Sequence, residues 1–263
     1  MLVQRVAVAV VAIPIILAVV VIGGELYDAV LAAVLAFAAV EFFWMVRGHW
    51  RAPLALGAGA AAAGLAIGAD SGYDWLVYAL AIVTGASLAA VVVTSDVEEG
   101  AANWTAFLGA VIYCGFLGAH FALLRDASEG LELVLIVLLA TYTADSAAYF
   151  VGITVGRRKF APRISPSKTW EGTVGAMVGG IVAVVLLAYV LDVDWSFLEI
   201  LGLALLFPVF AVAGDLAESV LKRSLEIKDT SKLIPGHGGI VDRLDSLLFT
   251  APLVFYWLVW VVN

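Results

Sequence analysis

Long apolar segments alternate with short polar connections along this chain. A helix rises about 1.5 Å per residue and therefore needs about 20 apolar residues to cross the hydrocarbon core of a bilayer. Nine segments roughly meet that length: 6–22, 29–46, 53–69, 75–94, 104–124, 131–151, 173–191, 197–213 and 247–262. The pattern predicts an all-α, polytopic transmembrane helical bundle of about nine spans.

Composition supports a membrane protein over a soluble one. Of the 263 residues, 63% are hydrophobic and only 14% are charged, and the charges cluster between the apolar segments. A soluble core would need polar surface spread along its whole length. The single cysteine, Cys114, excludes a disulfide framework and a thiolate metal site.

The positions of basic residues predict the orientation. With nine spans, every lysine and arginine except Arg125 falls on the same side as the N-terminus. Cytoplasmic loops hold the excess of basic residues, so we expect a cytoplasmic N-terminus and an outside C-terminus in the cell (inner) membrane. The first segment lacks a small-residue cleavage site and is interpreted as a retained span.

Chemistry-bearing residues concentrate after Arg125. We therefore expect residues 1–125 to form a transmembrane scaffold and residues 126–263 to form the catalytic region of one integrated membrane domain. Asp145 lies within an apolar segment, where a carboxylate costs about 2.5–3.5 kcal/mol, which favours a function over a structural role. Glu41, at the end of the second segment, has no charged cluster nearby in sequence and is interpreted as structural.

The connection 156–172 combines cations with hydroxyl groups. Five basic residues lie there, and Ser165, Ser167 and Thr169 flank Lys168 directly before a predicted helix. Basic side chains, hydroxyl donors and a helix N-terminus all favour anions. We interpret the connection as a phosphate site, the alternative being a plain topology signal.

Residues 214–246 hold the densest set of polar side chains. Asp215 and Glu218 are spaced i,i+3 on a predicted helix, with Ser219 and Lys222 adjoining. After a Pro235–Gly239 turn, Asp242 and Asp245 repeat the i,i+3 spacing at the start of the last span. Carboxylates beside cations suit a phosphoryl-type displacement, because hard oxygens hold Mg²⁺ and cations neutralise phosphates. Two simpler interpretations exist, namely charge pairs on a solvated helix for Asp215 to Lys222 and a flexible connection for the glycines. Each explains only one part of this set of residues.

The histidine of the turn has two interpretations. His237 serves either as an acid, base or ligand, or only to shape the turn between its glycine neighbours. No second histidine or cysteine lies close enough in sequence for a zinc site, and no G-x-S-x-G elbow is present.

The stretch from Ser219 to Asp245 resembles the signature of the phosphatidate cytidylyltransferase family, the CDP-diacylglycerol synthases. It contains Ser-x-apolar-Lys-Arg, then Lys-Asp, an Ile-Pro-x-His-Gly-Gly turn and Asp-Arg-x-Asp. Together with the blocks around Asp145 and Lys168, the similarity runs from about Asp145 to Ser246. The first half matches only as a set of spans.

The resemblance implies that CTP and a phosphatidic acid give CDP-diacylglycerol and pyrophosphate, with Mg²⁺ required, for phospholipid biosynthesis. The implied metal ligands are Asp215, Asp242 and Asp245, and the implied catalytic residues are Asp215, Asp245, Lys222 and Arg243. The other residues of the substrate site are then Asp145, Ser165, Ser167, Lys168, Ser219, Arg223, Lys228, His237, Gly238 and Gly239. The expected partners are CTP, the lipid phosphate and the bilayer, without nucleic acid, and related enzymes imply a homodimer.

Two other functions fit parts of the pattern. A CTP-dependent polyprenol or phytol kinase uses similar cations and Mg²⁺ but phosphorylates an alcohol. A secondary transporter is also polytopic, although the sequence lacks paired interrupted helices. The pattern leaves open whether the lipid tails are ester- or ether-linked, how many metal ions bind and which oligomer forms.

Overall fold

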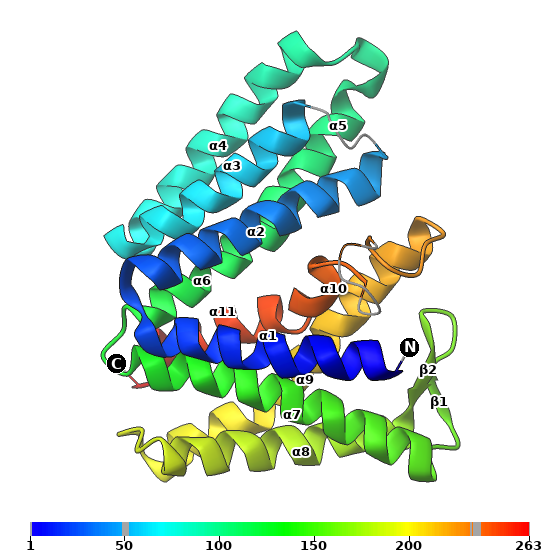
Figure 1. The fold of residues 1–263 in the computed structure, drawn as a ribbon. Helices are drawn as coiled ribbons and strands as arrows, with labels where there is room; N and C mark the ends of the chain where they lie inside the picture. Colours follow the sequence, from blue (N-terminus) through cyan, green and yellow to red (C-terminus); the bar gives the residue numbers. More distant parts are fainter. Residues whose placement is uncertain (1, 49–52, 232, 234–237, 263) are drawn as a thin grey trace. The chain divides into compact units, whose positions relative to one another are not determined.

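The described protein is almost entirely helical, with one two-stranded hairpin (Figure 1). The computed structural model describes residues 2–48, 53–231, 233 and 238–262, with side chains from Val10 onward. The first part comprises α1 Leu2–Ile22, α2 Gly24–Arg47, α3 Pro53–Gly68, a 3₁₀ turn Ala69–Ser71, α4 Tyr73–Thr94, α5 Val97–Ala110, a π-helical segment Val111–Phe116 and α6 Leu117–Arg125. The rest comprises α7 Gly130–Val155, β1 Lys159–Ala161, β2 Ser165–Thr169, α8 Trp170–Val190, α9 Phe197–Ser224, α10 Val241–Leu244, α11 Leu247–Trp257 and a π-helical segment Leu258–Val262.

The predicted helical membrane architecture is confirmed. Within the described residues, eight helical segments are long and apolar enough to cross a membrane, and each contains one of the predicted spans almost completely. The first predicted span is a shorter apolar helix, Val10–Ile22, in the part of α1 whose side chains are described. The orientation of the termini stays a prediction.

The chain forms two compact units. The first contains Met1–Asp126 and Asp229–Leu244, and the second contains Ala127–Lys228 and Asp245–Asn263. The first boundary lies one residue from the predicted division after Arg125, whereas segment 229–244 packs with the N-terminal helices. The proposed separation of scaffold from catalytic region stays a prediction.

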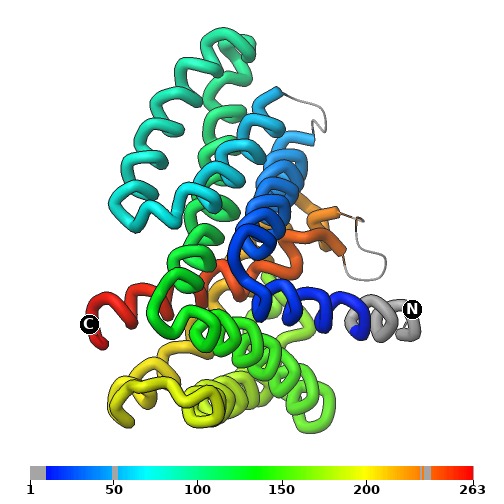
Figure 2. Tube along the Cα trace, turned by 60° about the vertical axis from the view of Figure 1, so that its left-hand side comes forward, coloured from blue at the N-terminus to red at the C-terminus, as the bar shows by residue number. Residues whose placement is uncertain are grey.

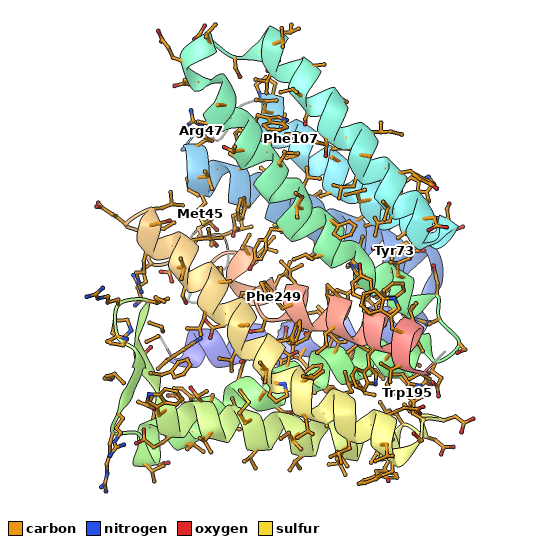
Figure 3. All side chains as sticks on the ribbon, turned by 180° about the vertical axis from the view of Figure 1, so that it is seen from behind. Met45, Arg47, Tyr73, Phe107, Trp195 and Phe249 are labelled. Atoms are coloured by element: carbon orange, nitrogen blue, oxygen red, sulfur yellow. The ribbon has the colours of Figure 1, made fainter. Side chains whose placement is uncertain are left out.

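In the first unit, α2 packs along α3 and α5, and α4 runs beside α5 (Figure 2). The Tyr27 hydroxyl donates to the Phe121 carbonyl at 3.0 Å. Arg47, at the end of the unit opposite Tyr73 (Figure 3), pairs with Glu99 at 3.3 Å. Long apolar helices thus dominate this unit, and polar contacts connect its helices near their ends.

In the second unit, α7 and α8 pack closely because α8 carries glycines on the shared face. A Cβ atom at Gly175 would lie 2.8 Å from the Val151 side chain, and one at Gly172 would lie 2.9 Å from the Ala148 carbonyl. Small residues permit such close approach between membrane helices. Helix α9 packs against α8 and α11 in the same unit.

Helix α9 extends beyond the apolar segment that predicted it. It starts at a capping box, in which Ser196 and Glu199 exchange side-chain and backbone hydrogen bonds. Its 28 residues rise about 42 Å, whereas the hydrocarbon core is about 30 Å thick. The polar residues from Asp215 onward therefore lie on the same rigid helix as the span, near or beyond the hydrocarbon boundary.

The basic connection 156–172 contains an antiparallel hairpin, which the sequence pattern did not predict. Lys159 pairs with Thr169 and Ala161 with Ser165, with an irregular register between them. Pro166 is tolerated because a two-stranded hairpin leaves one side of each strand without backbone partners. The Thr169 hydroxyl then accepts from the Gly172 N–H at 3.1 Å and caps α8. Strand β2 is thereby fixed directly to the start of a span.

Candidate active site

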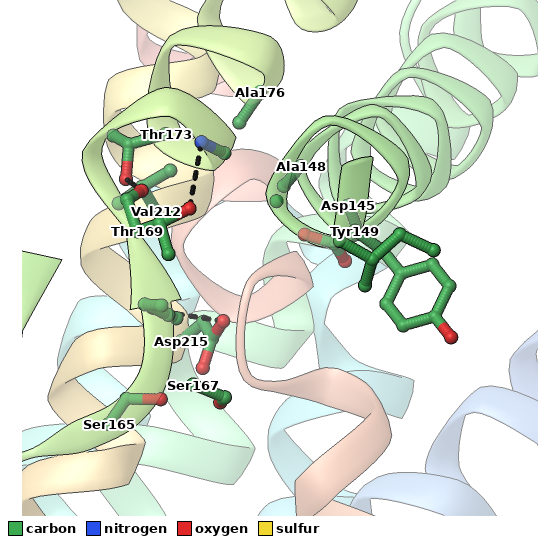
Figure 4. Close-up of a pocket in the computed structure, with 14 residues that line it drawn as sticks. Asp145, Ala148, Tyr149, Ser165, Ser167, Thr169, Thr173, Ala176, Val212 and Asp215 are labelled. Atoms are coloured by element: carbon green, nitrogen blue, oxygen red, sulfur yellow. Dashed lines mark hydrogen bonds and ion pairs between the residues drawn. The ribbon is translucent and has the colours of Figure 1, made fainter. Parts of the chain in front are cut away.

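A cavity of about 430 Å³ lies within the second unit, between α7, β2, α8 and α9. This volume is in the range of small-molecule sites, about 300–1,000 Å³. Its polar lining consists mainly of residues that the sequence had singled out: Asp145, Ser165, Ser167, Lys168, Thr169 and Asp215. Asp145 and Asp215 lie on different walls, on α7 and α9 (Figure 4). The fold thus brings the basic connection and two predicted carboxylates to one cavity.

An ion pair joins strand β2 to helix α9 inside this cavity. The Lys168 Nζ lies 2.6 Å from Asp215 Oδ2, and both side chains are largely shielded from solvent. Ser219, one turn further along α9, donates to Asp215 Oδ1 at 3.4 Å. Charge-assisted hydrogen bonds are stronger than neutral ones, so this pair holds both side chains in place.

A second ion pair lies one turn along the same helix. Glu218 is fully buried, and its carboxylate lies 2.6 Å from Lys222 Nζ. Lys222 was expected to hold a phosphate, but its charge is already paired in the structure. Its ammonium also acts on the Asp245 carboxyl, so it contributes positive potential to the site.

Asp245 lies close to Asp215 because two backbone segments touch. A Cβ atom at Gly214 would lie 2.5 Å from the Asp245 carbonyl oxygen and 3.0 Å from the Ser246 Cα. The charges of Asp215 and Asp145 both act on the Asp245 carboxyl, which accepts from the Ser246 N–H at 2.7 Å. The two helix ends that the sequence predicted to share a site are therefore adjacent.

The donor set around this point fits Mg²⁺. Within the described residues, no group of three acidic, histidine or cysteine side chains forms a complete protein cage for a metal. Mg²⁺ does not require one, because it is usually bound by one or two carboxylates, water and substrate phosphates. Asp215 and Asp245 would supply the hard oxygens for such an open site.

Several predicted residues lie outside the cavity lining. Arg223 Nε donates to the Ile164 carbonyl at 3.1 Å and thus ties the end of α9 to the hairpin turn. Lys228 is exposed at the end of the second unit. Gly238, Gly239, Asp242 and Arg243 belong to the first unit, and His237 lies outside the described residues.

Asp242 has partners of its own in the first unit. It is 8% exposed, and its Oδ2 accepts from the Thr230 N–H at 2.9 Å and from the Gly239 N–H at 2.8 Å. The Thr230 hydroxyl oxygen also lies 2.8 Å from this Oδ2. These contacts give the carboxylate a role in holding the loop. The role of Asp242 as a metal ligand stays a prediction.

Three polar residues, Glu218, Glu41 and Thr230, have partners in the structure that the sequence pattern did not assign to them. The i,i+4 spacing of Glu218 and Lys222 was available as a signal for their ion pair. Glu41, within a span, also deserved a functional interpretation, because buried intramembrane carboxylates are rare. No local signal marks Thr230, whose partners are 12 and 189 residues away.

Gly214→Ala tests the contact between α9 and the backbone at Asp245. The added methyl group meets backbone atoms that cannot rotate away, so α9 must shift relative to Asp245. We expect activity to fall by at least about tenfold, since misplacement by about 1 Å can cost about 100-fold. Gly85→Ala is the control, because a Cβ there meets nothing within 4 Å. Equal initial rates for the two purified variants would show that the close contact is dispensable.

Comparison with known proteins agrees with the architecture and the motifs. The Cytidylyltransferase family pattern matches residues 3–261. A phosphatidate cytidylyltransferase of Synechocystis sp. is 31% identical over 285 residues, covering 97% of this chain and 96% of that protein. Proteins with the same name from Bacillus subtilis and Haemophilus influenzae are each 39% identical, over 150 and 137 residues.

The matches differ in how much of each protein they cover. The chain spans about half the length of the last two relatives, 56% and 48%, and the matched residues form 57% and 51% of this chain. The family pattern instead extends from the first helix to the last, well beyond the stretch from Asp145 to Ser246 that carries the signature. On this match over nearly its whole length, the chain belongs to the cytidylyltransferase family.

Proposed function

We propose that this protein transfers the cytidylyl group of CTP to a membrane lipid phosphate of the phosphatidic acid type. The products are CDP-diacylglycerol, or its ether-lipid equivalent, and pyrophosphate. The observation that carries the proposal is the Lys168–Asp215 pair beside Asp245, in a cavity at the polar end of membrane helices. Membership of the cytidylyltransferase family supports the choice of CTP.

The reaction requires alignment and charge neutralisation more than covalent help from the protein. An oxygen of the lipid phosphate forms a bond to the α-phosphorus of CTP, and the bond to the β-phosphate oxygen breaks. The electron pair leaves with pyrophosphate. The second pKa of a phosphate monoester is about 6, so the nucleophile is largely ionised near neutral pH and needs no general base. The protein must bring two anions into line and offset their repulsion.

The residues of the cavity are suited to those tasks. Asp215 and Asp245 would hold Mg²⁺, which when bound neutralises phosphate charge and orients the oxygens. Lys168 would then exchange its contact with Asp215 for a phosphate oxygen. Ser165 and Ser167 of β2, which line the same cavity, would donate hydrogen bonds to the phosphates.

We place this site on the cytoplasmic side of the cell membrane. The basic hairpin and the C-terminal end of α9 both carry several lysines and arginines, which accumulate on that side. CTP reaches this end from water, while the lipid phosphate reaches it from the inner leaflet.

The test uses the purified full chain in lipid nanodiscs, with CTP labelled either in the cytosine ring or at the γ-phosphate. We expect the ring label in the lipid fraction and the γ-label in pyrophosphate. Chelation by EDTA should abolish transfer, and added Mg²⁺ should restore it. Separate reactions with ester- and ether-linked lipid phosphates identify the tail chemistry.

The rival functions give different products. A polyprenol or phytol kinase would place the γ-label on a lipid alcohol and release the ring label as CDP. A transporter would move a solute across proteoliposomes without CTP. Either result, with no ring label in the lipid phosphate fraction, would overturn the proposal.

A further inference from the structure

Glu41 is a buried carboxylate on α2, and both of its oxygens accept hydrogen bonds from a segment that is distant in sequence. Its side chain is 3% exposed. Oε1 accepts from the Thr230 hydroxyl at 2.5 Å and from the Val241 N–H at 3.1 Å. Oε2 accepts from the Ser231 hydroxyl at 2.9 Å and from the Ile240 N–H at 3.0 Å. Glu41 has no charged cluster beside it in sequence, and the fold surrounds it instead with hydroxyl and backbone donors from a distant segment.

The contacts of Glu41 hold both ends of the loop that contains the predicted glycine turn. Thr230 and Ser231 precede the turn, while Ile240 and Val241 follow it. Asp242 reinforces the same closure, because its Oδ2 accepts from Thr230 and from the Gly239 N–H. The Thr230 hydroxyl lies between the two carboxylates. Glu41 thus fastens both ends of the loop to α2 across about 190 residues of sequence, and Asp242 connects the two ends to each other.

The two glycines of the turn are required by this arrangement. Gly238 has a φ of +81°, which side-chain-bearing residues rarely adopt, and a Cβ there would lie 2.5 Å from Asp242 Oδ2. A Cβ at Gly239 would overlap both Glu41 Oε1 and Thr230 Oγ1. At both positions the carboxylates leave no room for a side chain.

The loop lies in sequence between two residues of the proposed site region. Lys228 precedes segment 229–244 directly, and Asp245 follows it directly, although both belong to the second unit. Glu41 accepts from the Ile240 and Val241 N–H groups at the start of α10, which have no carbonyl partner within this short helix. Because α10 ends at Leu244, fixing its start restricts where the next residue, Asp245, can lie.

From these contacts we infer that Glu41 is a positioning residue for cytidylyl transfer. It fixes the backbone at Ile240 and Val241, and through α10 it restricts where Arg243 and Asp245 can lie further along the chain. The inference rests on the proposed function. In the proposed reaction Glu41 touches no reacting atom and acts only through the loop.

Glu41→Gln is the sharpest test, since it keeps the size of the side chain. The amide NH₂ then faces donors where an oxygen had accepted, and buried donors left unsatisfied are costly. Glu25→Gln is the matched control, because Glu25 lies on the same helix with an exposed side chain. Thr230→Val provides a second variant, which removes the hydroxyl between Glu41 and Asp242 and leaves both acids in place.

Two measurements on the full chain in nanodiscs decide the inference. Hydrogen–deuterium exchange of peptides covering 238–244 should rise by about tenfold in Glu41→Gln, because charge-assisted hydrogen bonds that protect these amides are lost. Peptides from α7 and α8 should be unchanged. In steady-state assays, kcat should fall and KM for CTP should rise by about tenfold each, with Thr230→Val changed in the same direction.

Two results would contradict a positioning role for Glu41. A residue needed only for folding would lower the amount of active protein and leave KM for CTP at the wild-type value. That result, or wild-type exchange in 238–244, would overturn the inference. Failure of the proposed function is distinguishable, because the wild type would then make no CDP-lipid while the exchange data still report on the loop.

Discussion

Asp245→Asn is expected to lower cytidylyl transfer by about 10²- to 10³-fold, the size of the loss when one electrostatic group is removed from a preorganised site. Asparagine keeps the shape of the side chain but removes the charge that would hold Mg²⁺. The Mg²⁺ concentration needed for half-maximal activity should also rise. Initial rates at saturating CTP across a Mg²⁺ titration measure both effects.

The same substitution should leave stability unchanged or raise it. Asp245 lies in the negative field of Asp215 and Asp145, so a neutral side chain relieves repulsion. Functional sites often retain such unfavourable groups. The control is Asp194→Asn, which alters an exposed acid of the second unit. Near wild-type turnover in Asp245→Asn, or unfolding on purification, would contradict the assignment.

Lys168→Gln is expected to cost about 100-fold in kcat/KM for CTP. The substitution removes the cation that faces Asp215 at 2.6 Å and would contact phosphate in the proposed reaction. Asp215 is then left without its partner in a largely shielded position, so the variant should also lose some thermal stability. Rates over a CTP series and thermal unfolding in the same detergent measure the two effects.

A double-mutant cycle separates the two possible roles of Lys168. If the lysine only neutralised Asp215, Lys168→Gln would have no further effect in an Asp215→Asn background. We expect a further loss there, because a phosphate contact would be missing as well. Arg47→Gln is the control for removing a cation, since it breaks a partly exposed ion pair with Glu99 in the first unit. An effect of Lys168→Gln no larger than that control would contradict the proposed phosphate contact.

Hydropathy alone located the membrane helices. Each predicted segment lies almost wholly within an observed helix, because a span must satisfy its backbone internally and stay apolar over a length set by the bilayer. The spacing of polar residues on α9 was also informative, because Asp215, Glu218 and Lys222 follow one another at about one helical turn on the same face. These features depend on residues close together in sequence.

Tertiary structure decided which polar groups meet. Pairing within the basic connection, the contact of Gly214 with the Asp245 backbone and the closure of the glycine turn on Glu41 each join residues whose separation carries no periodic signal. A buried hydrogen-bond donor needs an acceptor wherever the fold supplies one, and sequence does not show which distant carboxylate that is. The sequence by itself therefore determined a helical membrane protein and most of its candidate chemical groups. Packing alone determined that Asp242 and Glu41 hold a loop, and that the close contact at Gly214 brings Asp245 beside Asp215.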